Sequence, residues 1–179
     1  PPVLLPAPGK VLLVFVEDWQ TVLDNAAASV ARVIVGIGLS FVVAVPLGLM
    51  IGRYRWLDLL TDWSIQIFRS VPPISLIPLA ILFLGIGDKP SIALIFLSGL
   101  WPLLINTIFG VRGIERTLIK VARAARAGEL LVMKDIILPA SLSAIFTGLR
   151  LAVGAGWLTV VTAEMIAVKK PVIFDCRVA

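Results

Sequence analysis

Apolar stretches about as long as a lipid bilayer is thick dominate this chain. From Ala26 to Ile51 the sequence is nearly all apolar, with Arg32, Ser29, Ser40 and Pro46 as its breaks. At 1.5 Å per residue, a helix of that length crosses ~30 Å of hydrocarbon. Apolar residues make up 59% of the 179 residues, whereas soluble domains contain ~45–50%. The excess must be buried in a bilayer, so we expect an all-α membrane protein.

Three further stretches predict membrane spans. The runs from Ser91 to Phe109 and from Ala144 to Val168 are long enough to cross. The run from Ile74 to Ile86 is short, so it either gains length from residues 69–73 or is a broken helix containing Pro78. A turn at residues 87–90 separates it from the next span. We therefore expect about four spans.

Two shorter segments have the pattern of amphipathic helices at the membrane surface. Residues 52–70 place tryptophan and leucine at helical spacing, and residues 10–24 alternate apolar residues with an acidic cluster. Both are too charged to cross, so we expect each to lie flat in the interface. Asp24 or Asn25 is expected to cap the first long helix.

The predicted spans contain glycines and prolines. Glycines offer surfaces for close helix packing at positions 36, 38, 48, 148, 154 and 156. Pro46, Pro78 and Pro102 each interrupt the backbone hydrogen bonds within a predicted span. Such breaks serve either as the bends of a moving gate or as static kinks.

The distribution of Lys and Arg predicts the orientation. Nine of the 16 basic residues fall in two connections, 52–70 and 112–139, whereas the turn at 87–90 contains only Lys89. These nine are Arg53, Arg55, Arg69, Arg112, Arg116, Lys120, Arg123, Arg126 and Lys134. The positive-inside rule places both connections in the cytoplasm and the turn outside.

Composition also excludes several classes of function. The net charge is +5, but the basic residues lie between apolar spans, which argues against a nucleic-acid binder. The chain has no histidine and a single cysteine, Cys176, so it offers no metal site and no disulfide. Its carboxylates are scattered, and it contains no phosphate-binding loop. We expect no catalytic site, no metal and no cofactor on this chain.

The connection at 112–139 contains a short amphipathic segment. Leu118, Val121, Ala122 and Ala125 share one helical face, and a second face carries Arg116, Lys120 and Arg123. Such a helix can fill a groove on a partner protein or rest on anionic lipid headgroups. These residues alone support both interpretations equally.

The spacing within this connection resembles the cytoplasmic loop of ABC importer permeases. That family's pattern is Glu-Ala-Ala, three residues, Gly, nine residues, Ile, one residue and Leu-Pro. Ala122, Ile136, Leu138 and Pro139 match, whereas Lys120, Val121 and Arg126 depart. Arginine adopts positive φ poorly, so either Gly128 provides the turn in place of Arg126 or the helix runs straight through. Four flanking segments resemble the sulfonate, taurine and nitrate importers: 69–72, 109–113, 147–151 and 163–165.

The resemblance implies a fold and a set of partners. It implies a MetI-like type I ABC importer permease domain over 1–179, present in part because such permeases usually have six spans. It also implies that 112–139 is a cytoplasmic coupling loop. The implied partners are ABC ATPase subunits, which would hold ATP and Mg, a second permease copy, a periplasmic or lipid-anchored solute-binding protein, and membrane lipids. The implied location is the bacterial inner membrane, and the implied solute is a small anion such as a sulfonate, taurine, nitrate or bicarbonate. The implied ATPase-docking residues are Arg116, Leu118, Lys120, Val121, Ala122, Arg123, Ala124, Ala125, Arg126 and Gly128.

Polar residues within the spans are candidates for the translocation path. They are Arg32, Asn106, Thr162 and Glu164. Each has a simpler explanation: arginine snorkels to the headgroups, Asn and Thr join helices, and Glu164 lies close to water near the end of its span. Arg150 is expected near the cytoplasmic end, as an anchor. A channel or a structural membrane protein with a lipid-bound basic loop is the alternative function.

Overall fold

The computed structural model describes residues 19–85, 87–125 and 128–167, and these residues contain helices and turns without a strand. The elements in chain order are α2 (Trp19–Arg53), α3 (Arg55–Arg69), the 3₁₀ turn η1 (Pro73–Leu76), α4 (Ile77–Leu84), α5 (Asp88–Arg112), α6 (Arg116–Ala124), α7 (Glu129–Val132), the π-helical turn η2 (Met133–Ile137) and α8 (Leu138–Ala167). The all-α expectation is confirmed. The surface helix expected over 10–24 falls largely outside the described residues.

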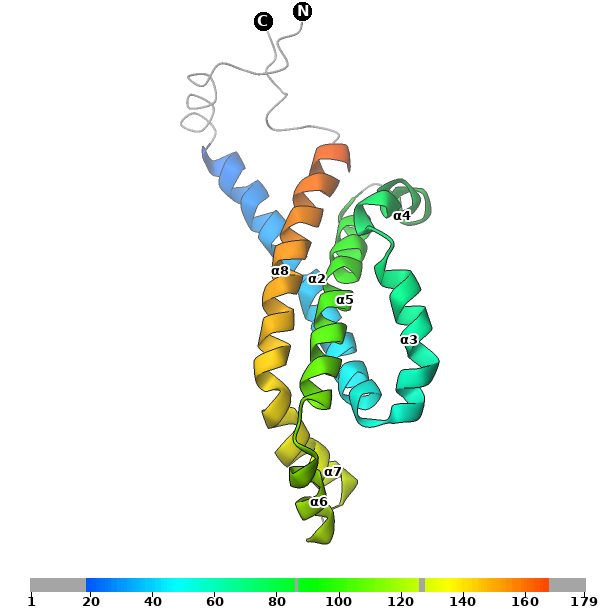
Figure 1. Cartoon of the computed structure of the whole chain (residues 1–179). Coiled ribbons are helices and arrows are strands. Elements are labelled where there is room, and N and C mark those ends of the chain that lie inside the picture. Colours follow the sequence, from blue (N-terminus) through cyan, green and yellow to red (C-terminus); the bar gives the residue numbers. More distant parts are fainter. Residues whose placement is uncertain (1–18, 86, 126–127, 168–179) are drawn as a thin grey trace, which may run out of the picture.

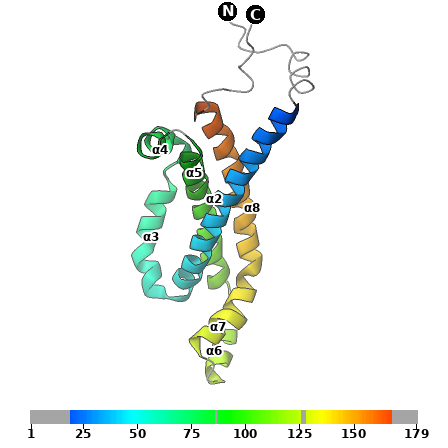
Figure 2. The ribbon, with the colours of Figure 1, turned by 180° about the vertical axis from the view of Figure 1, so that it is seen from behind.

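The long helices α2, α5 and α8 pack together as a bundle (Figures 1 and 2). All three are long and apolar enough to cross a membrane, and α8 runs on from α7 and η2 as one segment, Glu129–Ala163. These are the three long spans that the sequence predicts. The predicted cap at Asp24 or Asn25 is wrong, because both residues lie inside α2.

Glycines bring α5 into close contact with both neighbours. A Cβ atom added to Gly48 of α2 would lie 2.7 Å from the Cβ of Thr107, and one added to Gly148 of α8 would lie 2.9 Å from the Cβ of Asn106. Gly36 approaches Ile95 in the same way, whereas Gly38 faces open space. In lipid, the hydrophobic effect does not drive helices together. They associate instead through close backbone contacts of this kind.

A buried hydrogen bond adds to the contact between α2 and α5. Ser40 is fully buried, and its hydroxyl lies 2.7 Å from the carbonyl oxygen of Phe96 and 2.9 Å from that of Gly36. The side chain therefore bridges the two helices in an apolar environment, where an unpaired hydroxyl would be costly.

Ion pairs mark the two ends of the apolar region. Near one end, Arg32 of α2 lies 2.7 Å from Asp88, the first residue of α5. At the other end, α2 and α5 finish on Arg53 and Arg112. The rise from Arg32 to Arg53 is ~32 Å and that from Asp88 to Arg112 is ~36 Å. Both lengths suit a ~30 Å hydrocarbon layer, so the charges fall at its two borders.

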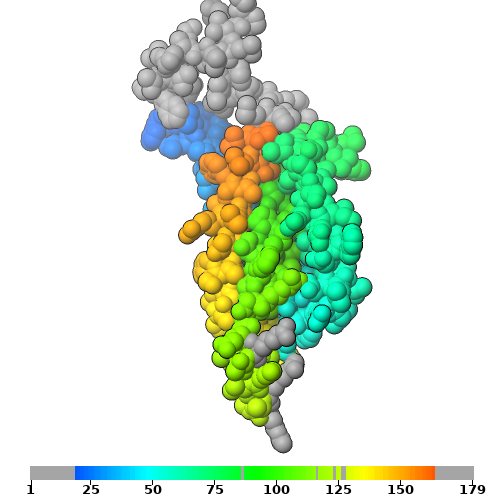
Figure 3. All heavy atoms as spheres, viewed as in Figure 1, coloured from blue at the N-terminus to red at the C-terminus, as the bar shows by residue number. Residues whose placement is uncertain are grey.

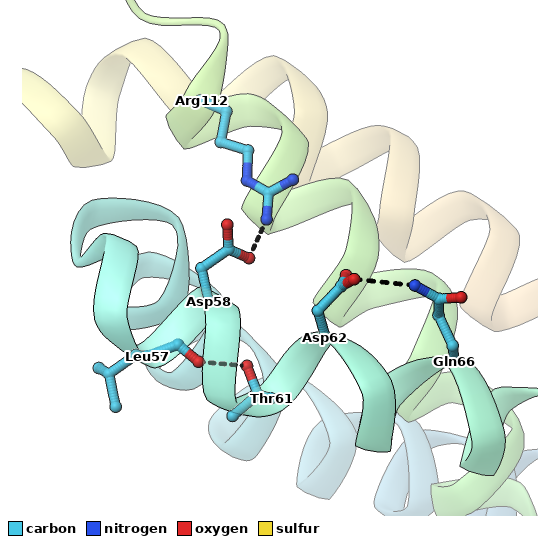
Figure 4. Close-up of polar contacts among 6 residues, drawn as sticks. All are labelled: Leu57, Asp58, Thr61, Asp62, Gln66 and Arg112. Atoms are coloured by element: carbon cyan, nitrogen blue, oxygen red, sulfur yellow. Dashed lines mark hydrogen bonds and ion pairs between the residues drawn. The ribbon is translucent and has the colours of Figure 1, made fainter.

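The helix α3 stands upright beside α5. At the C-terminal end of α5, Asp58 forms an ion pair with Arg112 (Figure 4). Ten residues on, the ring of Phe68 stacks on Trp101 with centroids 6.3 Å apart. The flat interfacial orientation predicted for 52–70 is therefore wrong, and Arg69 lies near the middle of α5 rather than at the end that holds Arg53 and Arg112.

A bend follows α3. The direction changes by 74° between Arg55–Arg69 and Pro73–Leu84, so the pair is at most one broken span. Pro78 lies in the first turn of α4 rather than within a span, whereas Pro46 and Pro102 do lie inside helices. The turn predicted at 87–90 lies earlier in the chain. Positive φ occurs at Gly85 and Gly87, and α5 begins at Asp88.

We expect Gly48→Ala to destabilise the bundle, because the new methyl group would overlap Thr107. The matched control is Gly38→Ala on the same helix, where nothing lies within 4 Å. Gly48→Ala should unfold with a free energy about 2 kcal/mol lower than that of Gly38→Ala. The measurement is thermal or SDS-induced unfolding in detergent micelles, and equal stability of the two variants would contradict the close α2–α5 contact.

Candidate functional site

The connection between α5 and α8 forms a tip that projects beyond the bundle. Figures 1 and 3 show α6 at its narrow end. Large apolar side chains are exposed on this tip: Val121 is 63% and Leu130 is 87% accessible, and Leu118 and Leu131 are also exposed. An apolar surface of this kind outside the bundle is typical of a protein interaction site.

The opposite side of α6 holds the tip in place. Ala122 is buried, and it belongs to the same apolar cluster as Ile114 and Val132, with Ile119 packed against that cluster. Of the apolar face proposed for docking, Leu118, Val121 and Ala125 are therefore exposed, whereas Ala122 faces inward.

The other predicted docking residues are placed as follows. Lys120, Ala124 and Gly128 are exposed. The side chains of Arg116 and Arg123, and the whole of Arg126, lie outside the described part. Gly128 precedes α7 with φ −64° and ψ 153°. Although glycine can adopt positive φ, Gly128 does not, so it does not provide the turn expected in place of Arg126.

A short π-helical turn connects the tip to α8. This turn, η2, ends immediately before Leu138 and Pro139. Proline has no N–H and its ring clashes with the carbonyl four residues earlier. A π turn shifts the hydrogen-bond register at that point, so the helix continues through the Leu-Pro pair without breaking.

Two ion pairs link this end of the bundle to its neighbours. Arg53 at the end of α2 lies 3.1 and 3.0 Å from the two carboxylate oxygens of Glu129, the first residue of α7. The Arg53 side chain is only 12% exposed. Arg112 and Asp58 join α5 to α3 in the same way. The tip is thus tied to α2, and α3 is tied to α5.

The residues proposed for a translocation path do not form one cluster. Arg32 pairs with Asp88 near one border, whereas Asn106 is ~27 Å further along α5. The Asn106 side chain donates to the carbonyl of Pro102 and packs against Gly148, as in a helix contact. Thr162 donates to the carbonyl of Leu158, and the side chain of Glu164 is outside the described part.

Arg150 is not the cytoplasmic anchor that the sequence suggested. Ala152, two residues on, packs against Gly99 near the midpoint of α5. Arg150 is exposed at this mid-height and makes no ion pair among the residues that the structure describes.

Sequence reasoning missed a pocket between α3, η1, α5 and α8. Its walls include Arg69, Ser98, Trp101, Ala155 and Thr159, and its volume is about 360 Å³. The signal that could have revealed it is the polar stripe of α3, in which Asp58, Asp62, Gln66 and Arg69 recur at helical spacing.

Comparisons with known proteins agree with this architecture. Residues 44–173 match the family described as binding-protein-dependent transport system inner membrane component. A putative ABC transporter permease of Methanocaldococcus jannaschii is 38% identical over 171 residues, which cover 92% of this chain and 64% of the relative. The taurine transport system permease of Escherichia coli is 32% identical, covering 93% of this chain and 63% of the relative. The bicarbonate transport system permease of Synechococcus elongatus is 34% identical, covering 83% and 51%. The chain thus spans between half and two thirds of the length of these relatives.

We expect Glu129→Gln to loosen the tip, because the largely buried Arg53 loses its paired carboxylate. Glu129 itself is 57% exposed, so the cost should be about 1 kcal/mol. Hydrogen–deuterium exchange of residues 116–125 should then accelerate about fivefold.

The matched control is Asp135→Asn, at an exposed acid of η2 that has no ion pair among the described residues. This variant should leave exchange of 116–125 unchanged. If both variants exchange at the same rate, the Arg53–Glu129 pair does not restrain the tip.

Proposed function

The chain belongs to the binding-protein-dependent transport system inner membrane components, and from this premise we propose that it is the permease subunit of an ATP-driven importer of a small anion. It would work with two ABC ATPase subunits, which hold ATP and Mg, with a second permease copy and with an external solute-binding protein. The solute class is supported by relatives whose names specify taurine and bicarbonate transport.

The observation that carries this proposal is the exposed apolar surface of the tip. Leu118, Val121 and Leu130 project from short helices that lie beyond the membrane-crossing bundle. Lys120 and Lys134 are exposed on the same connection, and the positive-inside rule puts this end in the cytoplasm. A short helix with exposed apolar side chains fits a groove on a partner protein, and residues 112–139 would be the coupling loop that inserts into the ATPase.

The geometry suggests how movement of the ATPase would reach the membrane. The segment Glu129–Ala163 is continuous, so a displacement of the tip would act directly on α8. The Arg53–Glu129 pair would carry the same displacement to α2. Because α5 packs closely on both helices, the bundle would tilt as a unit rather than deform.

We expect the double variant Leu118→Asp with Val121→Asp to lose the ATPase. Both side chains are exposed, so the bundle should still fold, but two carboxylates would have to be desolvated in the docking groove. The yield of ATPase that co-purifies with the permease should fall at least ~10-fold, since each tenfold loss corresponds to only ~1.4 kcal/mol.

The matched control is Leu118→Met with Val121→Ile, which keeps the surface apolar and should retain the complex. Undiminished co-purification of the aspartate variant would overturn the docking role. Uptake in reconstituted vesicles that proceeds without ATP would instead favour a channel.

A further inference from the structure

A pocket at mid-depth in the membrane lies between α3 and the bundle. Its volume is about 360 Å³, and its walls come from α3, η1, α5 and α8. On α5, Trp101 is ~16 Å from Arg112 and ~20 Å from Asp88, at 1.5 Å per residue. The pocket is therefore about halfway between the charged borders of the apolar region.

The side chains on the two sides of α3 differ in polarity, and this difference indicates which side faces lipid. Its large apolar side chains are exposed and lie together on one side of the helix: Trp56, Leu59, Leu60, Trp63 and Ile67. The polar stripe of Asp58, Asp62, Gln66 and Arg69 lies on another side, and Asp58 on that stripe pairs with Arg112 of α5 (Figure 4). Charged groups at this depth face protein or water rather than hydrocarbon. At one end of the stripe Asp58 faces Arg112, and at the other end Arg69 belongs to the pocket wall.

Most of the pocket wall is apolar, and its few polar members suit an anion. Arg69 belongs to this wall, and a guanidinium can bind an oxyanion through two parallel hydrogen bonds. No Asp or Glu is among the described residues of the pocket wall. Ser98 and Thr159 line it as well, and their hydroxyls now donate to carbonyls of their own helices at 2.8 and 2.9 Å. Such hydroxyls can rotate to donate elsewhere.

An unsatisfied donor lies in the same wall. The Nε1–H of Trp101 is buried and has no acceptor among the described residues. A buried donor of this kind carries a cost that an incoming acceptor relieves. The pocket thus combines one cation with an unmet N–H group, and its size falls within the ~300–1,000 Å³ of small-molecule sites.

We propose that this pocket is a station on the solute path, where Arg69 contacts a small oxyanion such as a sulfonate or bicarbonate as it crosses. The proposal rests on the proposed function, since it assumes that the chain conducts a solute. It names Arg69, rather than Arg32 or Asn106, as the residue that selects for negative charge. None of the residues of α3 is buried, so movement of this helix would let the pocket open to either side.

A cysteine-accessibility experiment tests the pocket without knowledge of the solute. Ala155 lines the pocket, and the chain's single cysteine, Cys176, can be replaced by serine. In this background, Ala155→Cys is reconstituted in phosphatidylethanolamine–phosphatidylglycerol vesicles. It is then treated with anionic sulfonatoethyl or cationic trimethylammonioethyl methanethiosulfonate. Rates are normalised to the reaction of each reagent with free cysteine.

We expect the anionic reagent to react about tenfold faster than the cationic one, because Arg69 raises the local potential. Arg69→Gln should abolish this preference. The matched control Arg55→Gln removes the same charge from the same helix ~21 Å away and should preserve it. As a lipid-facing reference, Val42→Cys, at an exposed apolar position of α2, should react with neither reagent.

Two outcomes would overturn the proposal. If neither reagent modifies position 155, the pocket is not on a water-filled path. If both react equally with Arg69 intact, the pocket is hydrated but does not select anions. In the complete transporter, Arg69→Gln should reduce uptake of radiolabelled taurine or bicarbonate at least tenfold while the ATPase still co-purifies. Co-purification of the ATPase with the Leu118→Asp, Val121→Asp variant tests the coupling role alone. A negative result in one experiment therefore leaves the other proposal standing.

Discussion

The close approach of α5 to both α2 and α8 is the contact on which the other features depend. Gly48 and Gly148 allow it from the two neighbouring helices, and the Ser40–Phe96 hydrogen bond adds to its α2 side. Lipid tails are as apolar as these helices, so backbone approach and buried hydrogen bonds must hold the bundle together. The same contact fixes the relative heights of the helices. It thereby sets the position along the bundle of the charges at the two membrane borders, of the tip and of the pocket wall.

The long spans could be predicted from the sequence because the signal for each is local. Length and apolarity of a single segment identify α2, α5 and most of α8. The orientation of α3 could not be predicted in this way. Its amphipathic pattern fits a helix lying flat at the surface and equally an upright helix with its polar stripe along a groove. Only contacts between residues far apart in sequence distinguish the two orientations: Asp58 with Arg112 and Phe68 with Trp101.

The candidate sites show the same division between local and long-range information. The position of the proposed coupling segment follows from its spacing to Leu138 and Pro139, which the sequence contains in full. The inward position of Ala122 could not be predicted from the sequence of α6. Residues outside α6, such as Val132, decide which face of this helix is covered. The pocket is formed by α3 and η1 together with α5 and α8, which are distant from them in sequence, so no single motif identifies it. The continuous segment from Glu129 to Thr159, ~45 Å long, joins the tip to that pocket.

The charges of α3 have a consequence for biogenesis. With Arg55, Asp58, Asp62 and Arg69 in fifteen residues, the isolated helix has little tendency to leave the insertion machinery for lipid, since each charge opposes partitioning. Arg112, the partner of Asp58, is the last residue of α5 and is synthesised 54 residues after Asp58. We therefore expect α3 to be retained near the translocon until α5 arrives, so that this part of the chain enters the bilayer as an assembled hairpin rather than one helix at a time.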